Sequence, residues 1–321
     1  MSNWRTRVTD LLNIQYPIVQ GGLAYLAYAD LASAVSNAGG LGQITAMSLS
    51  SPDELKKEIR KTKSMTDKPF GVNFAIGQHG RPFEHMLEAA IEEGVQVVSV
   101  TGGNPTGFFK KLEGVPVKKL VLVAAKRQAL KAEELGADAV IVVGQEGGGH
   151  IGRDDTGTFV LVPTVVDALR IPVIASGGIA DGRGFMAALS LGAEGIEMGT
   201  RFIATKECIH ASNRYKQAII DGTESDTEVI KRTLKAPGRV IGTPWSNKII
   251  ELEDAGASFE DLKEYISGSA NKRYIYDGKP ELGFGWAGQA IGLINKVLSV
   301  EELIKMIIKD AEKIRMKWSV K

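Results

Sequence analysis

The chain has one cysteine, Cys208, among its 321 residues, so it cannot form an internal disulfide. It also lacks metal-ligand spacing: its four histidines, His79, His85, His150 and His210, form no HxxxH pair, and no CxxC is present. We therefore expect no metal site. A single free thiol is typical of proteins from reducing compartments, so we expect a cytoplasmic location.

An excess of charge of one sign is missing as well. The 39 basic and 38 acidic residues leave a net charge of +1, and nothing favours a nucleic acid or an anionic membrane as partner. The longest apolar runs, LVLVAA and AVIVV, are far too short to span a bilayer. The start, MSNWRTRVTDLL, has a basic flank without a continuous apolar segment, so we expect no secretory signal. The expected partner is a small molecule, and a homo-oligomer is compatible with the sequence.

Short β-branched runs alternate with amphipathic segments up to about residue 205. The expected strands are residues 16–22, 40–46, 69–75, 95–101, 118–124, 137–143, 171–178 and 194–200. The segments between them place apolar residues at i, i+3 and i+4, which predicts helices. Ser51, Pro52 and Glu54 are suited to starting one such helix. Glycines at the expected ends of others are Gly39, Gly94, Gly136 and Gly192.

Strands that are apolar on both faces and alternate with helices are typical of a parallel sheet covered by helices. Eight such units favour a (β/α)8 barrel. The alternative, an open Rossmann-like sheet, fits less well because no GxGxxG follows the first strand.

We expect residues 1–205 and 286–321 to form the barrel, with long helical periodicity resuming at residue 286. Residues 206–285 show no clear strand run and predict a helical insertion after strand 8. Barrel active sites lie at the rim from which this insertion leaves, so a lid over the substrate is the preferred role. An interaction module is the alternative.

Glycine and small polar residues gather where the expected strands end. In (β/α)8 enzymes the loops after strands 7 and 8 often bind phosphate through backbone N–H groups. Ser176, Gly177 and Gly178 end strand 7, and Gly199 and Thr200 end strand 8. Tight turns alone would account for either loop, but the two together favour a phosphate site.

His150 lies in the sixth loop, within GQEGGGHIGR at residues 144–153. The glycines around it leave little packing to hold a structural histidine and suggest a close approach of backbone to a ligand. Since an imidazole has an ordinary pKa near ~6.5, we expect a catalytic or substrate-orienting role. Asn73, at the end of the third strand, suits the edge of a heterocycle, with a plain turn residue as an equal alternative. Arg153 is expected to form only a local surface ion pair with the acidic residues that follow it.

The chain resembles the nitronate monooxygenases, FMN-dependent (β/α)8 barrels formerly called 2-nitropropane dioxygenases. The motifs that carry the resemblance occur in the same order and span about residues 5–300: YPIVQGG, GVNF, GQEGGGHIGR, PVIASGGIADG, LGAEGIEMGTRF and WAGQAIGLI. Flavin-type enoyl-acyl-carrier-protein reductases and NADH:quinone reductases look similar at the same motifs.

The resemblance implies FMN as cofactor and assigns its contacts residue by residue. The histidine near the reactive face of the flavin matches His150. The cofactor-binding positions match a first loop of Gly22, Leu23 and Ala24, a strand-3 asparagine at Asn73, a glycine-rich loop at Gly148 and Gly149, and a phosphate grip of Ser176, Gly177, Gly178, Gly199 and Thr200.

The first activity that the resemblance implies is oxidation of alkyl nitronates by O2 to a carbonyl compound and nitrite. In that reaction His150 would abstract a proton from a nitroalkane or hydrogen-bond the nitro group of a nitronate. The alternative is an NAD(P)H-dependent flavin reductase acting on quinones or enoyl thioesters. Val143 stands where many nitronate monooxygenases have glutamine, and Leu23 and Ala24 stand where some relatives have methionine and a polar residue. These departures bear on the substrate and the electron donor.

Two other classes fit the sequence less well. Inosine-monophosphate dehydrogenases use a cysteine nucleophile on the sixth loop, where this chain has His150 and no cysteine. A phosphate-binding barrel without activity would require a colourless protein that takes up no FMN.

Overall fold

Eight parallel strands form a barrel in the computed structural model, which describes residues 4–77 and 82–319. The strands are hydrogen-bonded in the order β1-β9-β8-β6-β5-β4-β3-β2. Val19 pairs with Leu41, the residue before β2, and thereby joins the two ends of the sheet. The (β/α)8 class and all eight expected strands are confirmed. Their bounds are β1 Ile18–Gln20, β2 Gly42–Thr45, β3 Phe70–Ala75, β4 Val97–Thr101, β5 Lys118–Val123, β6 Ala139–Val143, β8 Val173–Ser176 and β9 Gly195–Met198.

The N-terminal end of the barrel is filled by side chains. Helix α1 (Arg7–Leu12), which the sequence analysis did not predict, places Val8 and Leu12 in one buried cluster with interior strand residues such as Leu120 and Ile174. Because this end is packed, a ligand has to bind at the C-terminal ends of the strands.

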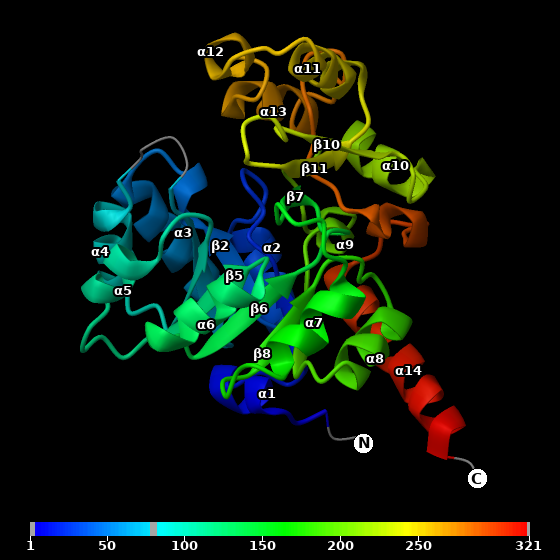
Figure 1. Cartoon of the computed structure of the whole chain (residues 1–321). Helices are drawn as coiled ribbons and strands as arrows, with labels where there is room; N and C mark the ends of the chain where they lie inside the picture. The colour runs from blue at the N-terminus through cyan, green and yellow to red at the C-terminus, as the bar shows by residue number, and fades with distance from the viewer. Residues whose placement is uncertain (1–3, 78–81, 320–321) are drawn as a thin grey trace.

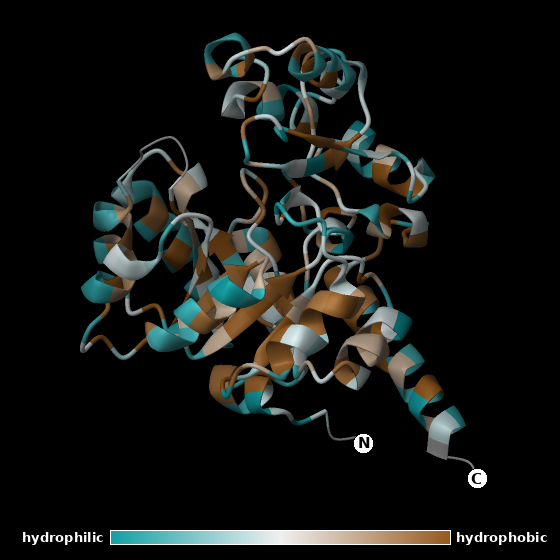
Figure 2. Ribbon diagram, in the orientation of Figure 1, coloured by the Kyte–Doolittle hydropathy of each residue, from teal (hydrophilic) through white to brown (hydrophobic). Residues whose placement is uncertain are grey.

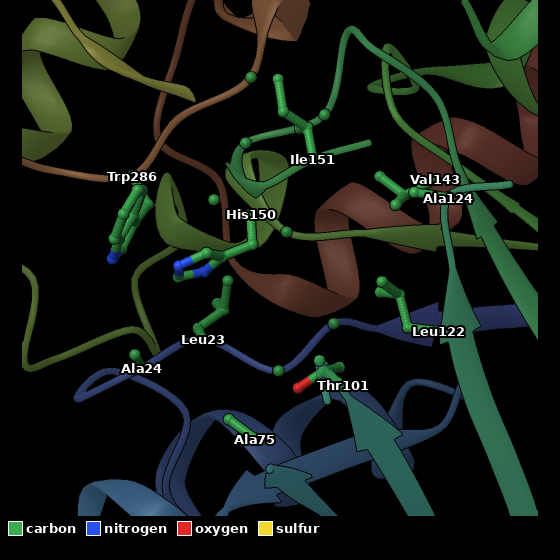
Figure 3. Close-up of a pocket in the computed structure, with 18 of the residues that line it drawn as sticks. Leu23, Ala24, Ala75, Thr101, Leu122, Ala124, Val143, His150, Ile151 and Trp286 are labelled. Atoms are coloured by element: carbon green, nitrogen blue, oxygen red, sulfur yellow. The ribbon is translucent and has the colours of Figure 1, made fainter. Parts of the chain in front are cut away.

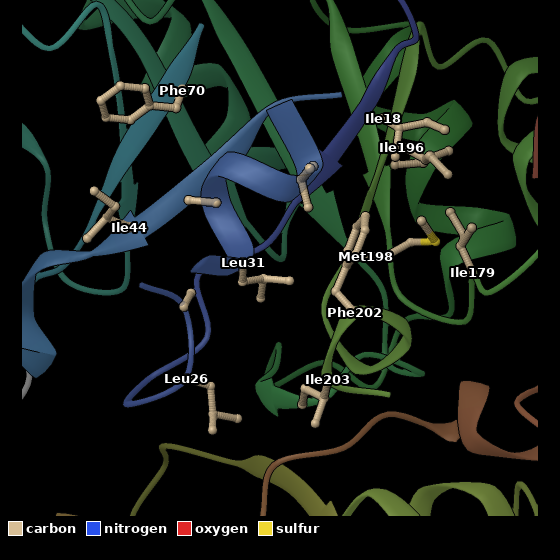
Figure 4. Packing of buried hydrophobic residues seen from close by; sticks show 14 of the residues in the cluster. Ile18, Leu26, Leu31, Ile44, Phe70, Ile179, Ile196, Met198, Phe202 and Ile203 are labelled. Carbon is tan, nitrogen blue, oxygen red and sulfur yellow. The ribbon is translucent and has the colours of Figure 1, made fainter. Parts of the chain in front are cut away.

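Helices surround the strands, and the buried apolar side chains between the two layers make the main core (Figures 1 and 4). Figure 2 shows hydrophobic strands in the middle and hydrophilic residues on the outer faces of the helices. The surrounding helices are α2 Ala29–Asn37, α3 Pro52–Met65, α4 Glu84–Glu92, α5 Thr106–Lys111, α6 Lys126–Glu134, α7 Thr158–Val166, α8 Gly182–Ser190 and α14 Val300–Ser319.

The predicted helix ends are confirmed by the backbone. The Ser51 side chain accepts the N–H of Glu54, and Pro52 occupies the first turn of α3. The four glycines expected at helix ends all have φ between 66° and 93°, the left-handed region that glycine adopts without strain.

The last helix completes the outer layer. α14 packs against α8 and α2. A Cβ on Gly182 would lie 2.7 Å from the backbone nitrogen of Ala311, so glycine allows α8 and α14 to approach closely. None of the described helices combines the length and the apolar character needed to cross a bilayer.

Between β9 and α14 the chain forms a cap that stands over one end of the barrel (Figure 1). The insertion contains helices, as expected, but the expectation that it holds no strand needs correction, because two antiparallel strands, β10 (Thr227–Ile230) and β11 (Gly238–Ile241), accompany them. Each strand has only four residues, which is too short for periodicity to reveal. The helices of the cap are α10 Asn213–Asp221, α11 Pro244–Asp254, α12 Phe259–Leu262 and α13 Gly268–Ile275.

The cap has its own hydrophobic cluster, which includes Ile230, Val240, Ile249 and Phe284. β11 also pairs with β7 (Gly149–His150), so a three-stranded sheet joins the cap to the sixth barrel loop. The helical periodicity expected from residue 286 becomes an α-helix only at Val300, since a 3-10 helix, η2 (Gln289–Leu293), precedes it. The division of the chain at residues 206 and 285 stays a prediction.

Candidate active site

One cavity of about 980 Å³ is lined both by the C-terminal ends of the barrel strands and by residues of the cap. Leu23, Ala24 and His150 project into it (Figure 3). Every residue that the sequence analysis proposed for the site borders this cavity: Gly22, Leu23, Ala24, Asn73, Gly148, Gly149, His150, Ser176, Gly177, Gly178, Gly199 and Thr200.

The ends of β8 and β9 offer hydrogen-bond donors on one side of the cavity. Gly177 and Gly178 have φ of 95° and 75°, conformations that turn the backbone sharply after β8. Gly199 precedes the short helix α9 (Thr200–Ile203), which no side chain caps. The hydroxyl of Thr200 accepts the N–H of Gly288 at 2.9 Å and keeps its own hydrogen for another acceptor. This arrangement of donors fits a phosphate.

Glu146 connects the sixth loop to the loop after β8, where a phosphate is expected. Its Oε2 accepts the backbone N–H of Thr158, the first residue of α7, at 2.9 Å. The hydroxyl of Thr158 lies 2.9 Å from the same oxygen and 3.0 Å from the carbonyl oxygen of Gly177. Thr158 thus connects the loop after β6 with the loop after β8.

The glycines beside His150 serve close packing within the chain. A Cβ on Gly148 would lie 2.5 Å from the nitrogen of Gly288, and a Cβ on Gly147 would lie 2.6 Å from a methyl group of Val143. Gly149 has φ of 79°, with open space where a Cβ would be. Approach to a ligand is therefore not the only reason for this glycine run, since the segment that returns from the cap lies against it.

Asn73 packs against the first loop. Its Nδ2 donates to the hydroxyl of Ser99 at 2.8 Å, and a Cβ on Gly22 would lie 2.3 Å from its Oδ1. Asn73 is 2% exposed and still borders the cavity. Its amide therefore links β3, β4 and the first loop at the place where a heterocycle edge was expected.

Polar groups that no sequence motif indicated are also buried beside the cavity. Glu197 on β9 accepts from the hydroxyl of Ser176 at 3.2 Å, and burial raises its pKa to about 7. Among the described residues, the hydroxyl of Thr45 is buried without a hydrogen-bond partner. Both Thr45 and Glu197 line the cavity. An orphaned hydroxyl there is satisfied if a ligand with polar atoms fills the space.

Apolar side chains line the part of the cavity next to His150. Figure 3 places Ala75, Leu122 and Val143 at the ends of β3, β5 and β6. Such a surface suits a flat aromatic ring, whereas the glycine-rich loops after β8 and β9 suit its phosphate tail.

His150 belongs to strand β7 and is held by the cap. Gly238 of β11 is its partner across the sheet, and its ring lies 5.1 Å from that of Trp286 at 42°. Its Nε2 lies 2.6 Å from Nζ of Lys231. No local signal reveals Lys231, which follows His150 by 81 positions.

The other histidines and the acidic residues after Arg153 have different surroundings. His85 is exposed beside Glu88, and the ring of His210 packs edge-on to Tyr28. His79 falls outside the described residues. Asp155 pairs with Arg232 of the cap, so the local pair expected with Arg153 is wrong for this carboxylate. No group of residues suited to a metal ion occurs in the described part of the chain.

A family model described as nitronate monooxygenase matches residues 5–310. The chain belongs to the nitronate monooxygenase family. The resemblance expected from the motifs is thereby confirmed, and the protein is a flavin-dependent oxidoreductase.

Proteins that are similar to this chain carry different names. The solved structure of FabK from Thermotoga maritima is 42% identical, with a TM-score of 0.91 and 98% of each chain covered. A probable nitronate monooxygenase from Staphylococcus saprophyticus is 34% identical over 96% of this chain and 98% of its own. A (3aS,4S,5R,7aS)-5-hydroxy-7a-methyl-1-oxo-octahydro-1H-indene-4-carboxyl-CoA dehydrogenase from Rhodococcus jostii is 34% identical over 98% of this chain and 97% of its own.

Proposed function

We propose that the protein uses FMN and NAD(P)H to reduce a carbon–carbon double bond conjugated to a thioester. FabK is an enoyl-acyl-carrier-protein reductase, and the Rhodococcus relative is named for a CoA thioester. Nitronate oxidation, the first activity implied by the sequence, remains the second candidate, because the family model and the Staphylococcus relatives carry that name.

The size of the cavity is the observation that favours the thioester. Its volume of about 980 Å³ lies at the upper end of the range of about 300–1,000 Å³ for pockets that hold one drug-sized ligand. A cavity of this volume leaves space for a second ligand beside a flavin, and its extension under the cap favours a substrate longer than a nitroalkane. The cap residues that line it, including Phe259, Ile266 and Phe284, extend an apolar wall beyond the barrel rim.

FMN, when bound, supplies the hydride chemistry. The proposed role of Ser176, Gly178 and Thr200 is to hold its phosphate through N–H and O–H donors. Asn73 would bind the polar edge of the ring, and Leu122 and Val143 would keep water away from its face.

The proposed task of His150 is to donate a hydrogen bond to the substrate oxygen that gains negative charge. In a thioester this is the carbonyl oxygen, and in a nitronate it is a nitro oxygen. A donor that already points at that oxygen lowers the activation free energy of the reaction, because the protein need not reorganise as the charge develops.

Anaerobic titration of the purified, flavin-loaded protein separates the two activities. We expect NADH or NADPH to bleach the flavin and an enoyl thioester such as crotonyl-CoA to restore its colour. Bleaching by propyl-2-nitronate without NAD(P)H, combined with no response to either nicotinamide, would instead establish the nitronate reaction. Chromatography of the released cofactor tests FMN against other flavins.

A further inference from the structure

Lys231, the residue after β10, places its ammonium against the imidazole of His150. Nζ lies 2.6 Å from Nε2 of His150 and 5.0 Å from the centre of the Trp286 ring. The residue is 8% exposed although it borders the cavity. Lysine is almost never buried to this degree without a partner, and here the partners are a histidine and an aromatic face.

The backbone at Lys231 is held in an unfavourable conformation. Its φ of 64° lies in the left-handed region, which residues with a Cβ rarely occupy. The buried carboxylate of Glu253 on α11 accepts the N–H of Lys231 at 2.7 Å and the N–H of Thr233 at 3.0 Å. Strain that the surrounding structure maintains in this way is concentrated at functional sites.

The charge of Lys231 determines which atom donates. Burial lowers its pKa to about 8, with the attraction of Glu253 opposing the change. At pH 7 the ammonium is therefore the main form, and an ammonium can only donate. Within residues 4–77 and 82–319, the titratable groups that face it are Glu253 from α11 and His150 from β7. The neighbouring arginines are engaged elsewhere, Arg232 with Asp155 and Arg239 with Gln145 and Thr227.

We propose that Lys231 is a positioning residue that keeps His150 neutral, with the ring proton on Nδ1, and so makes His150 a hydrogen-bond donor rather than a base. Nε2 must offer its lone pair to the ammonium, and the proton of the neutral ring then resides on Nδ1. The positive charge behind the ring polarises the Nδ1–H bond and strengthens the bond that it donates. The proposal rests on the proposed place of His150 beside the substrate.

The protonation and the tautomer of the His150 imidazole can be measured without substrate or turnover. Nitrogen-15 NMR of the flavin-loaded protein with labelled histidine reports which ring nitrogen carries hydrogen, and His150→Asn assigns the signals by their loss. At pH 7 we expect hydrogen on Nδ1 and none on Nε2 in the wild-type protein. Hydrogen on Nε2, or an equal mixture of the two tautomers, would overturn the proposal whatever the enzyme's substrate proves to be.

Variants of Lys231 test the cause. Lys231→Met should leave the ring exchanging between tautomers, whereas Lys231→Arg should keep the hydrogen on Nδ1. Both variants retain a side chain at a left-handed position, so the backbone strain is matched. Lys235→Met is the control for loss of a lysine at a left-handed position, because Lys235 has a φ of 53° and is exposed at the edge of the same cavity. An unchanged His150 spectrum in Lys231→Met would contradict the proposal.

Kinetics give a second readout. Loss of one oxyanion donor costs about 10²–10³ in kcat, and because Lys231 acts through His150 we expect a smaller loss, about ten-fold, in Lys231→Met. Lys231→Arg should recover most of it. If the NMR result holds while no thioester is reduced, the proposed substrate is wrong and the role of Lys231 stands.

Discussion

Gly148 of the sixth loop and Gly288 of the segment that returns from the cap lie backbone against backbone. A Cβ on Gly148 would stand 2.5 Å from the nitrogen of Gly288, and a Cβ on Gly288 would stand 2.5 Å from the carbonyl oxygen of Glu146. The cap is thus attached to the loop that carries His150 at a place where only glycine fits.

Gly148→Ala should destabilise the protein by about 1–3 kcal/mol, because the added methyl group meets backbone that must move. Flavin affinity should fall with it. Urea unfolding and flavin titration measure both effects. Gly107→Ala is the matched control: Gly107 is exposed in α5 with nothing within 4 Å of the added carbon, so that variant should be unchanged or more stable by up to ~1 kcal/mol. Equal stability of the two variants would contradict the packing argument.

Thr200→Val should lower both stability and flavin affinity. Valine keeps the shape but removes the oxygen that accepts the buried N–H of Gly288, and an unsatisfied buried donor costs about 1–3 kcal/mol. Thr200→Ser retains that oxygen and should bind flavin nearly as well as the wild type. Fluorescence quenching on titration with FMN compares the three proteins. If Thr200→Val and Thr200→Ser bind FMN equally tightly, the hydroxyl of Thr200 has no part in holding the phosphate.

Glu197→Gln should make stability less dependent on pH. The pKa of Glu197 rises from 4.5 to about 7 in the folded state because the carboxyl is buried. The folded protein therefore loses stability relative to the variant as pH rises from about 4.5 to 7, by on the order of 3 kcal/mol in full. Urea unfolding of both proteins at equal flavin content, at pH 5 and pH 8, measures the difference. A gap that does not widen toward pH 8 would show that Glu197 is not held protonated.

Substitutions of His150 distinguish a hydrogen-bond donor from a proton-transfer group. The amide nitrogen of asparagine lies near the position of Nδ1, while glutamine reaches the position of Nε2. We expect His150→Leu and His150→Gln to lose about 10²–10³ in kcat, and His150→Asn to lose less. All three should still bind FMN. Equal losses in the three variants would indicate that the imidazole itself exchanges a proton.

The barrel can be predicted from the sequence because each strand and each helix has its own local pattern of apolar residues. Runs such as AVIVV at β6 are apolar on both faces, and the turn after β8 contains Gly177 and Gly178, which have the positive φ that glycine adopts without strain. His150 stands out for the same local reason, since it follows a run of glycines at a strand end.

The sequence by itself therefore determined the (β/α)8 class, the family and the loops that line the cavity. Only the tertiary structure decided that Gly149 and His150 pair with β11, that Gly148 packs on Gly288, and that Lys231 reaches Nε2. Periodicity and turn chemistry act over a few residues, whereas these contacts join segments that are far apart in the chain. Their positions depend on how the cap sits on the barrel, and that follows from the packing of the whole molecule.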